Sequence, residues 1–241
     1  MKAIVLAAGF ATRMYPLTRS VAKPLLDVAG EPIVTHILRR VEAVTEVSGA
    51  VVVTNHRFHE AFVRWAQDTR FRFPVQLVDD GTMEDDQRLG AVRDMALAME
   101  LAGDEDTLVV AGDTLVDVDL AVAAREFRTH RRPLLLVRDV DARGARPYND
   151  VELDSEGRVT RFREKPAESS ASLAAICLYF FPASVRALMR RYLDGGGNPD
   201  SPGYFIEWLA RETHVNATHF AGRWFDIGSI EGLETARKAW G

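Results

Sequence analysis

The chain has 241 residues, 47% hydrophobic and 27% charged, and its net charge is −5 because 30 Lys and Arg face 35 Asp and Glu. One cysteine, Cys177, excludes an internal disulfide framework and a multi-cysteine zinc site, and it fits a reducing, cytoplasmic compartment. The acidic balance argues against a nucleic-acid partner, and the lack of any apolar stretch of roughly 18 residues argues against a membrane partner.

Short apolar runs alternate with helical patterns through the first half of the chain. Three runs rich in Val, Leu and Ile lack polar alternation, which is typical of strands buried on both faces: 3–7, 50–54 and 107–111. Apolar residues at helical spacing lie around 33–41, 58–65 and 91–101, and 75–78 is a further strand candidate. The alternation predicts an α/β fold with a doubly wound, mostly parallel, Rossmann-like sheet.

The pattern changes after about residue 133. The runs 133–137, 150–153, 158–163 and 173–181 are predicted strands joined by short turns, which indicates a mixed or antiparallel extension of the sheet. Helices are predicted around 185–189, 205–212 and 230–240, with a glycine-rich loop at 194–199. Because no flexible linker interrupts the chain, we expect one domain over 1–241, whose halves, about 1–132 and 133–241, form a pocket together.

The loop after the first strand carries a chemical signal. Ligands of an open parallel sheet bind outside the carboxyl ends of the strands, which is where residues 7–18 are predicted to lie. Small residues there let backbone N–H groups approach an anion, and Arg13 and Lys23 can neutralise phosphate oxygens. The spacing fits neither a dinucleotide fingerprint nor a P-loop, so this is either another kind of phosphate loop or a tight turn with surface cations.

The run from Leu6 to Thr18, continued by Lys23-Pro24-Leu25-Leu26, closely resembles the signature L-A-A-G-x-G-T-R-L-x-P-L-T of the sugar-1-phosphate nucleotidylyltransferases, or NDP-sugar pyrophosphorylases. This family includes glucose-1-phosphate thymidylyltransferases and mannose-1-phosphate guanylyltransferases. The resemblance implies that Arg13 and Lys23 are catalytic and stabilise the reacting phosphates. It implies that the nucleotide is bound by the loop residues Leu6, Ala8, Gly9, Thr12 and Arg13. Ala11 departs from the family's usual glycine.

Two aspartates are metal-ligand candidates. Asp113 ends a buried strand, where its carboxylate can hold Mg²⁺, a cation that prefers oxygen ligands; alternatively it is a loop or helix-cap residue. The Gly112-Asp113 pair resembles the metal-binding segment of the family. Asp226, in Trp224-Phe225-Asp226-Ile227-Gly228, resembles the family's second metal ligand, although it could instead cap the following helix. Their pairing around Mg²⁺ is implied by the resemblance alone.

Further segments resemble the family's sugar-phosphate side. Glu164-Lys165-Pro166 is similar to an E-K-P segment in which the lysine meets the sugar phosphate and the glutamate a sugar hydroxyl; otherwise the pair is solvated surface. Tyr148-Asn149-Asp150-Val151-Glu152 is similar to Y-G-V-V-E, which implies that Asn149 binds substrate, in place of a glycine.

A turn near the nucleotide base matches less well. Gly90 corresponds to the glycine of the family's L-G-T-A-G turn, which implies contact with the nucleotide. The residues that stand in place of the usual small ones either recognise an unusual acceptor or are solvated: Arg88, Arg93 and Asp94.

The resemblance implies an enzyme of nucleotide-sugar biosynthesis that uses Mg²⁺ to transfer a nucleotide from a nucleoside triphosphate to a sugar-1-phosphate. A homo-oligomer is compatible with it, because members are often dimers or tetramers. One alternative is a cytidylyltransferase acting on phosphocholine or a phosphonate, with aromatic walls from Tyr148, Tyr204, Phe205 and Trp224. Another is a non-catalytic sensor of nucleotide sugars, which would have no need of the aspartate pair.

Two other features favour ordinary structural roles. His56 and His59 lie three positions apart without a third ligand or an H-E-x-x-H pattern, so we expect no metal there. Cys177 lies in an apolar run and is predicted to be a core residue without a nucleophilic role.

Overall fold

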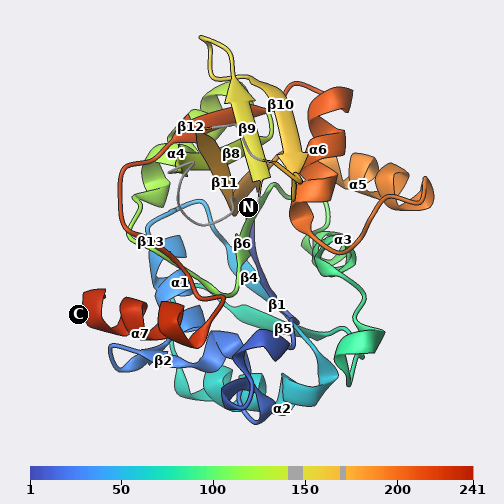
Figure 1. Cartoon of the computed structure of the whole chain (residues 1–241). Helices are drawn as coiled ribbons and strands as arrows, with labels where there is room; N and C mark the ends of the chain where they lie inside the picture. The colour runs from blue at the N-terminus through green and yellow to red at the C-terminus, as the bar shows by residue number, and fades with distance from the viewer. Residues whose placement is uncertain (141–148, 169–171, 241) are drawn as a thin grey trace.

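The computed structural model describes residues 1–140, 149–168 and 172–240, and its centre is a sheet in the order β10-β9-β11-β6-β1-β4-β5, to which β8 and β12 are joined through β11 (Figure 1). The strands of this sheet are β1 (Lys2–Ala7), β4 (Gly49–Thr54), β5 (Val75–Asp79), β6 (Thr107–Ala111), β8 (Leu134–Asp139), β9 (Asn149–Leu153), β10 (Val159–Glu164), β11 (Leu173–Phe181) and β12 (Asn216–His219). Two short pairs lie outside it: β2 (Asp27–Val28) with β3 (Glu31–Pro32), and β7 (Thr114–Val116) with β13 (Trp224–Asp226).

The first half of the chain forms the predicted parallel sheet. Strand β1 pairs in parallel with β4 on one side and β6 on the other, so that Val5 lies between Val52 and Val110. Strand β5 extends the sheet beyond β4, again in parallel. The strand order therefore reverses between β1 and β6, and ligands of doubly wound sheets bind at such a reversal.

Alternate side chains of the central strands enter two apolar layers, as period-two geometry requires. Val5 and Val52 face α1 (Ile33–Val41), α2 (His56–Asp68), α4 (Leu120–His130) and α7 (Ile230–Ala239). Ile4 and Val51 face α3 (Ala91–Ala102), α5 (Val185–Asp194) and α6 (Pro202–Glu212). Helices thus cover both faces of the sheet, which confirms the predicted α/β class.

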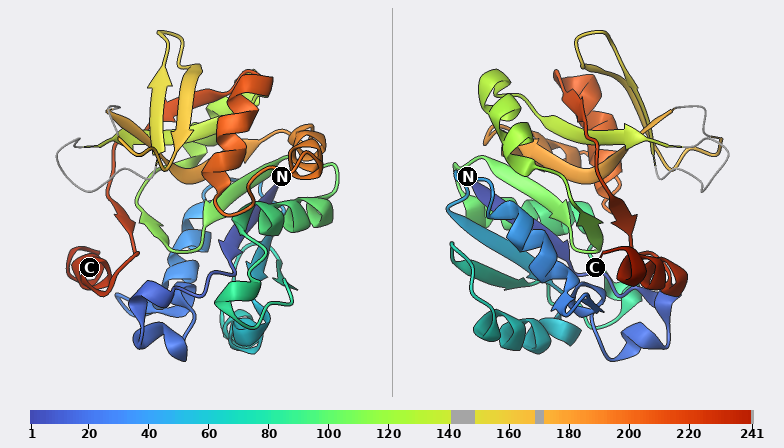
Figure 2. Two further views of the ribbon diagram at one scale, coloured as in Figure 1. Left: turned by 45° about the vertical axis from the view of Figure 1, so that its right-hand side comes forward. Right: turned by 90° about the vertical axis from the view of Figure 1, so that its left-hand side faces the viewer.

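The second half of the chain adds the predicted mixed extension. Strand β11 lies antiparallel to β6 and β8, β9 and β10 form an antiparallel pair, and β12 runs parallel to β8. Figure 2 shows this extension above the parallel half, and the pairing of β11 with β6 joins the two into one sheet. Among the described residues, no helix has the length and apolar character needed to cross a membrane.

Helix α4 is absent from the predicted elements. It begins after Asp119, whose Oδ1 accepts a hydrogen bond from the Ala121 amide at 3.0 Å, a typical N-cap. Its buried stripe contains two alanines between Leu120 and Phe127, so the hydrophobic period is weak in the sequence.

Candidate active site

Two side-chain hydrogen bonds hold the backbone of the loop after β1, and Gly9 in this loop is exposed. The carbonyl of buried Ala8 accepts a 2.9 Å hydrogen bond from Asn55 Nδ2, and the carbonyl of Ala11 accepts one of 2.8 Å from Thr18 Oγ1. Gly9 is exposed, and a Cβ placed on it would meet no atom within 4 Å. Held this way, the exposed backbone near Gly9 faces space in which an anion could be bound.

Three short 3-10 helices continue from this loop: η1 (Thr12–Met14), η2 (Leu17–Arg19) and η3 (Lys23–Leu25). Thr12 and Arg13 are exposed, while Leu6 at the end of β1 is half-buried. Ala11, the departure from the family signature, has φ 50° and so makes the left-handed turn despite its methyl group. That conformation costs an alanine about 1 kcal/mol, since glycine alone avoids the steric penalty.

The fold brings Asp113 and Asp226 together. Asp113 follows β6, and Asp226 ends β13, which pairs antiparallel with β7 so that Asp226 lies opposite Thr114. The Ile227 amide donates a 3.1 Å hydrogen bond to the Asp113 carbonyl. The structure thus places the two predicted metal ligands beside each other at the carboxyl end of β6.

Gly112 lets this end of β6 approach β1. Its amide donates a 2.8 Å hydrogen bond to the Leu6 carbonyl, and a Cβ at this position would lie 2.6 Å from the same oxygen. No side chain fits there, so the glycine fixes Asp113 against the start of the phosphate loop.

Lys23 contacts Asp113 directly. Its Nζ lies 2.6 Å from Asp113 Oδ2, and the two side chains are 13% and 30% exposed. Within the described ranges, no group of three or more His, Cys, Asp or Glu side chains could hold a metal ion. Two carboxylates nevertheless fit Mg²⁺, which proteins commonly bind through one or two carboxylates together with substrate phosphates.

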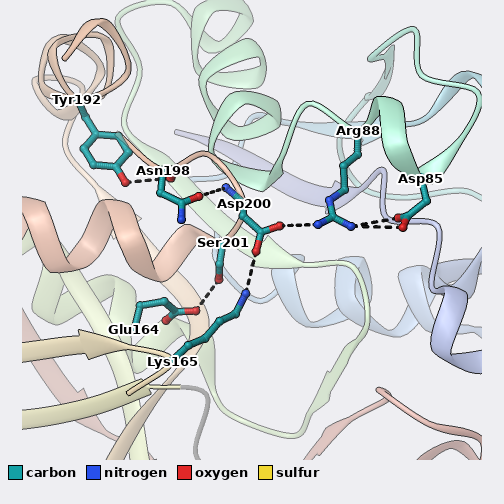
Figure 3. Close-up of polar contacts among 8 residues, drawn as sticks. All are labelled: Asp85, Arg88, Glu164, Lys165, Tyr192, Asn198, Asp200 and Ser201. Carbon is teal, nitrogen blue, oxygen red and sulfur yellow. Dashed lines mark hydrogen bonds and ion pairs between the residues drawn. The ribbon is translucent and has the colours of Figure 1, made fainter. Parts of the chain in front are cut away.

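Glu164 ends β10 and Lys165 follows it, and Figure 3 shows their side chains beside Ser201 and Asp200. Glu164 is buried, accepts a 2.6 Å hydrogen bond from Ser201 Oγ, and packs on Gly203 so closely that a Cβ there would overlap its carboxylate. Burial raises the pKa of Glu164. The exposed Lys165, at φ 46°, places its Nζ 2.8 Å from Asp200 Oδ2.

Asp200 was not predicted, yet it links the two halves of the molecule. It accepts from Lys165 and, through Oδ1 at 3.1 Å, from Arg88 Nη2, which approaches from the opposite side in Figure 3. The hydrogen bond from Lys165 helps to lower the pKa of Asp200. The one sequence signal was its place directly after the glycine-rich loop 194–199.

Gly90 has a packing role in the structure. It has φ 93°, and a Cβ there would overlap the Pro199 carbonyl. The Val92 amide donates to that carbonyl at 3.0 Å, so the N-terminus of α3 binds the loop of the second half. Contact of Gly90 with a nucleotide therefore rests on the family resemblance.

Asn149 is part of the sheet. It is buried, its Nδ2 donates to the Ala175 carbonyl at 3.1 Å, and its Oδ1 accepts from the Ala175 amide at 2.7 Å. Both ends of the amide thus join β9 to β11. Only the family resemblance supports a role of Asn149 in substrate binding. Tyr148, the predicted aromatic neighbour, lies outside the described residues.

Cys177 lies in β11, within the electrostatic reach of both Asp113 and Glu164, and it is half-buried rather than fully buried. It has φ 52°, at a register shift of β11. Burial, with the negative charges of Asp113 and Glu164, raises the pKa of its thiol, which therefore stays neutral at pH 7. A neutral thiol is a poor nucleophile.

Comparisons with known proteins agree with this geometry. The family described as nucleotidyl transferase matches residues 2–240. The glucose-1-phosphate thymidylyltransferase of Streptomyces antibioticus is 30% identical over 236 residues, covering 95% of this chain and 63% of that protein. The mannose-1-phosphate guanylyltransferase catalytic subunit beta of Danio rerio is 28% identical over 236 residues, covering 95% of this chain and 61% of that protein.

The chain thus spans less than two thirds of the length of these relatives. Among solved structures, a UDP-glucose pyrophosphorylase complexed with UDP-glucose matches with a TM-score of 0.84 at 20% identity, covering 99% of this chain and 97% of that one. A UTP-bound UGPase from Acinetobacter baumannii matches with a TM-score of 0.79 at 20% identity, covering 100% and 93%. Fold and sequence agree, and the chain belongs to the nucleotidyl transferase family.

Proposed function

We propose that the chain is a sugar-1-phosphate nucleotidylyltransferase, which joins the nucleotide of a nucleoside triphosphate to a sugar-1-phosphate and releases pyrophosphate. The observation that carries this proposal is the meeting of Lys23, Asp113 and Asp226 beside the open loop at Gly9. The names of the relatives, which are thymidylyl-, uridylyl- and guanylyltransferases, support the same reaction class.

In this reaction, a phosphate oxygen of the sugar-1-phosphate forms a bond to the α-phosphorus. The bond from that phosphorus to the bridging oxygen of the β-phosphate breaks, and pyrophosphate leaves with the electron pair. The attacking oxygen is already anionic at pH 7, so the protein needs no general base. Its contribution is positioning and neutralisation of phosphate charge, which are worth several kcal/mol in well-oriented sites.

The cations on the nucleotide side have distinct positions. Arg13 is exposed at the open edge of the loop, where it can reach the leaving pyrophosphate. Lys23 is shielded and already paired with Asp113, so it lies deeper, where the α-phosphate would be. Asp113 and Asp226 would hold Mg²⁺, which neutralises charge on the reacting phosphates when bound.

Lys165 would bind the phosphate of the acceptor. Its present partner, Asp200, is 39% exposed and Lys165 itself 48% exposed. Exposed ion pairs contribute only about 0.2–1 kcal/mol. An acceptor phosphate can therefore replace Asp200 as the partner of the Lys165 ammonium group with little loss of free energy. Glu164 lies next to it, with one oxygen bonded to Ser201.

The test is pyrophosphate release from five nucleoside triphosphates, each paired with a panel of sugar-1-phosphates, phosphocholine and phosphonates, with Mg²⁺. Release with at least one sugar-1-phosphate is the expected result. Release with none of the pairs would contradict an enzymatic function and favour a nucleotide-sugar sensor. Release only with CTP and phosphocholine or a phosphonate would establish a cytidylyltransferase instead.

A further inference from the structure

The carboxyl group of Asp94 is buried without a partner. The residue is 7% exposed, and its Oδ1 has no hydrogen-bond partner among the residues described. Burial, with the charge of Asp80, raises the pKa of Asp94 to about 7. Buried polar atoms in folded proteins nearly always have partners, so this acceptor points to a donor that comes from outside the chain.

Asp80 lies at the same corner of the molecule. Its amide donates to the Thr54 carbonyl at 2.9 Å, which places it at the carboxyl end of β4. Its Oδ1 accepts from the amide and hydroxyl of Thr82 at 2.8 and 2.7 Å, while Oδ2 bonds to nothing in the described part of the chain. Helix α3, which carries Asp94, packs against β1 and β4.

This corner adjoins the phosphate loop. Ala8 shares an apolar cluster with Val92 and Met95 of α3. Ala8 also accepts the hydrogen bond from Asn55, the residue after β4. A ligand whose phosphates lie over Gly9 can therefore extend its other end toward Asp80 and Asp94.

The strand order and the charges of this corner identify which end that is, and this step rests on the proposed function. In the transition state the attacking acceptor oxygen and the leaving pyrophosphate lie in line through the α-phosphorus, and the nucleoside extends to the side of that line. Lys165 follows β10 at one side of the sheet, Asp113 follows β6 at the centre, and β4 and β5 lie on the far side of β1. The carboxylates of Asp80 and Asp94 would repel the negatively charged pyrophosphate. The nucleoside is therefore the part of the donor that extends over the ends of β4 and β5, which lie beyond β1 in Figure 1.

Above pH 7, where Asp94 is ionised, the carboxylates of Asp80 and Asp94 favour a base that presents hydrogen-bond donors. Uracil and thymine present two carbonyl oxygens around a single N–H, so carboxylate oxygens would repel them. Cytosine and adenine each offer one amino group next to a ring-nitrogen acceptor. Guanine has its N1–H beside its N2 amino group, two adjacent donors for two acceptors. We propose that Asp80 and Asp94 select guanine, and that GTP is the nucleotide donor.

The experiment compares kcat/KM for GTP, ITP, CTP, ATP, UTP and dTTP at pH 8, at a saturating concentration of the sugar-1-phosphate that supports pyrophosphate release in the panel above. GTP should exceed UTP and dTTP by about tenfold or more, because a site built for donors rejects a base without them. ITP, which lacks only the N2 amino group, should be weaker than GTP through a higher KM.

Asp80→Asn and Asp94→Asn keep the side-chain shape but remove the second acceptor oxygen. Each should lower kcat/KM for GTP about tenfold or more, narrow the GTP-to-ITP ratio, and leave UTP and dTTP unchanged or improved. Asp86→Asn removes the charge of an exposed acid six residues after Asp80; it is the matched control and should match wild type. A thermal melt of each variant confirms that it is folded.

The outcomes separate the two proposals. Pyrophosphate release from UTP or dTTP at the level of GTP or above leaves the enzymatic function standing and overturns guanine selection. An equal loss for all nucleotides in Asp80→Asn and Asp94→Asn also overturns it. Failure of every nucleotide with every acceptor contradicts the proposed function itself.

Discussion

At the scale of single residues, the ammonium group of Lys23 balances the carboxylate of Asp113 in this structure. The proposed reaction places substrate phosphates around both groups, so each substitution there removes a charge that the transition state requires. Arg13, in contrast, is exposed and its loss should leave the fold intact.

We expect Arg13→Ala and Asp113→Asn each to lower the rate of pyrophosphate release by about two orders of magnitude or more, the usual effect of removing one preorganised electrostatic contact. Arg19→Ala is the control for Arg13, since Arg19 is also exposed in the same loop and packs over the Tyr15 ring. A near-native rate in either site variant, with an unchanged melting temperature, would remove that residue from the mechanism.

Asp94 makes stability depend on pH. Its pKa is about 7 in the folded protein against 3.8 for the free group, so the folded state holds a proton between these values that the unfolded state has lost. The contribution of Asp94 to stability is therefore greatest at and below about pH 4, falls as the pH rises to about 7, and is then level. The fall is up to about 4 kcal/mol.

Asp94→Asn cannot ionise, so it should melt at a higher temperature than wild type at pH 8 and at a similar temperature at pH 4. Thermal melts of both proteins across pH 4–8 measure this. Equal melting temperatures at pH 8 would show that the carboxyl group has a lower pKa than its burial implies. Asp94→Asn would then gain stability and lose kcat/KM for GTP, which is a trade-off between stability and function.

At the scale of elements, the glycines at the two ends of α3 differ in their surroundings. Gly90 before the helix and Gly103 after it both have positive φ, at 93° and 65°. A Cβ on Gly90 would overlap the Pro199 carbonyl, whereas one on Gly103 would meet no atom within 4 Å. Only the first glycine is required for packing between the two halves.

Gly103→Ala should cost about 1–3 kcal/mol of stability through backbone strain alone. Gly90→Ala should cost more, and it should also raise the KM of the acceptor, because Pro199 and Asp200 would move together and Asp200 contacts Lys165. Urea denaturation and steady-state kinetics measure the two effects. Equal costs for the two variants would contradict the close contact.

The central strands could be predicted because an apolar run buried on both faces has few alternatives. Strands β1, β4 and β6 agree with prediction to within one residue at each end, as does the half-buried edge strand β5. The pairing of β7 with β13 could not, because strands of three residues carry no periodic signal. The closeness of Asp113 and Asp226 depends on that pairing. Asp200 and the role of Gly90 depend likewise on contacts between segments far apart in sequence.

At the scale of the whole molecule, the proposed substrates bridge both halves, since Arg13 and Lys23 belong to the first half and Lys165 to the second. A ligand that binds the folded state at a hundred times its Kd adds about 2.7 kcal/mol to stability. For a chain of this size that corresponds to a rise in Tm of roughly 5–10 °C.

We expect such a rise with a nucleoside triphosphate and Mg²⁺ together, and a smaller one when EDTA replaces Mg²⁺, because the triphosphate would then lack a cation between it and Asp113. Differential scanning fluorimetry measures both. Pyrophosphate release should stop in EDTA and return with excess Mg²⁺. An unchanged rate in EDTA would exclude a role for the metal.

The antiparallel pairing of β13 with β7 also determines when the site can exist. During synthesis the phosphate loop near Gly9 emerges first, and the parallel strands can pair long before Asp226 is made. Contacts between residues so distant in sequence form late in folding, because the chain must close a long loop to make them. The pair of carboxylates is therefore assembled only when β13 pairs, and a nascent chain that already holds the arginine and lysine of the phosphate loop cannot yet offer both carboxylates to the proposed metal.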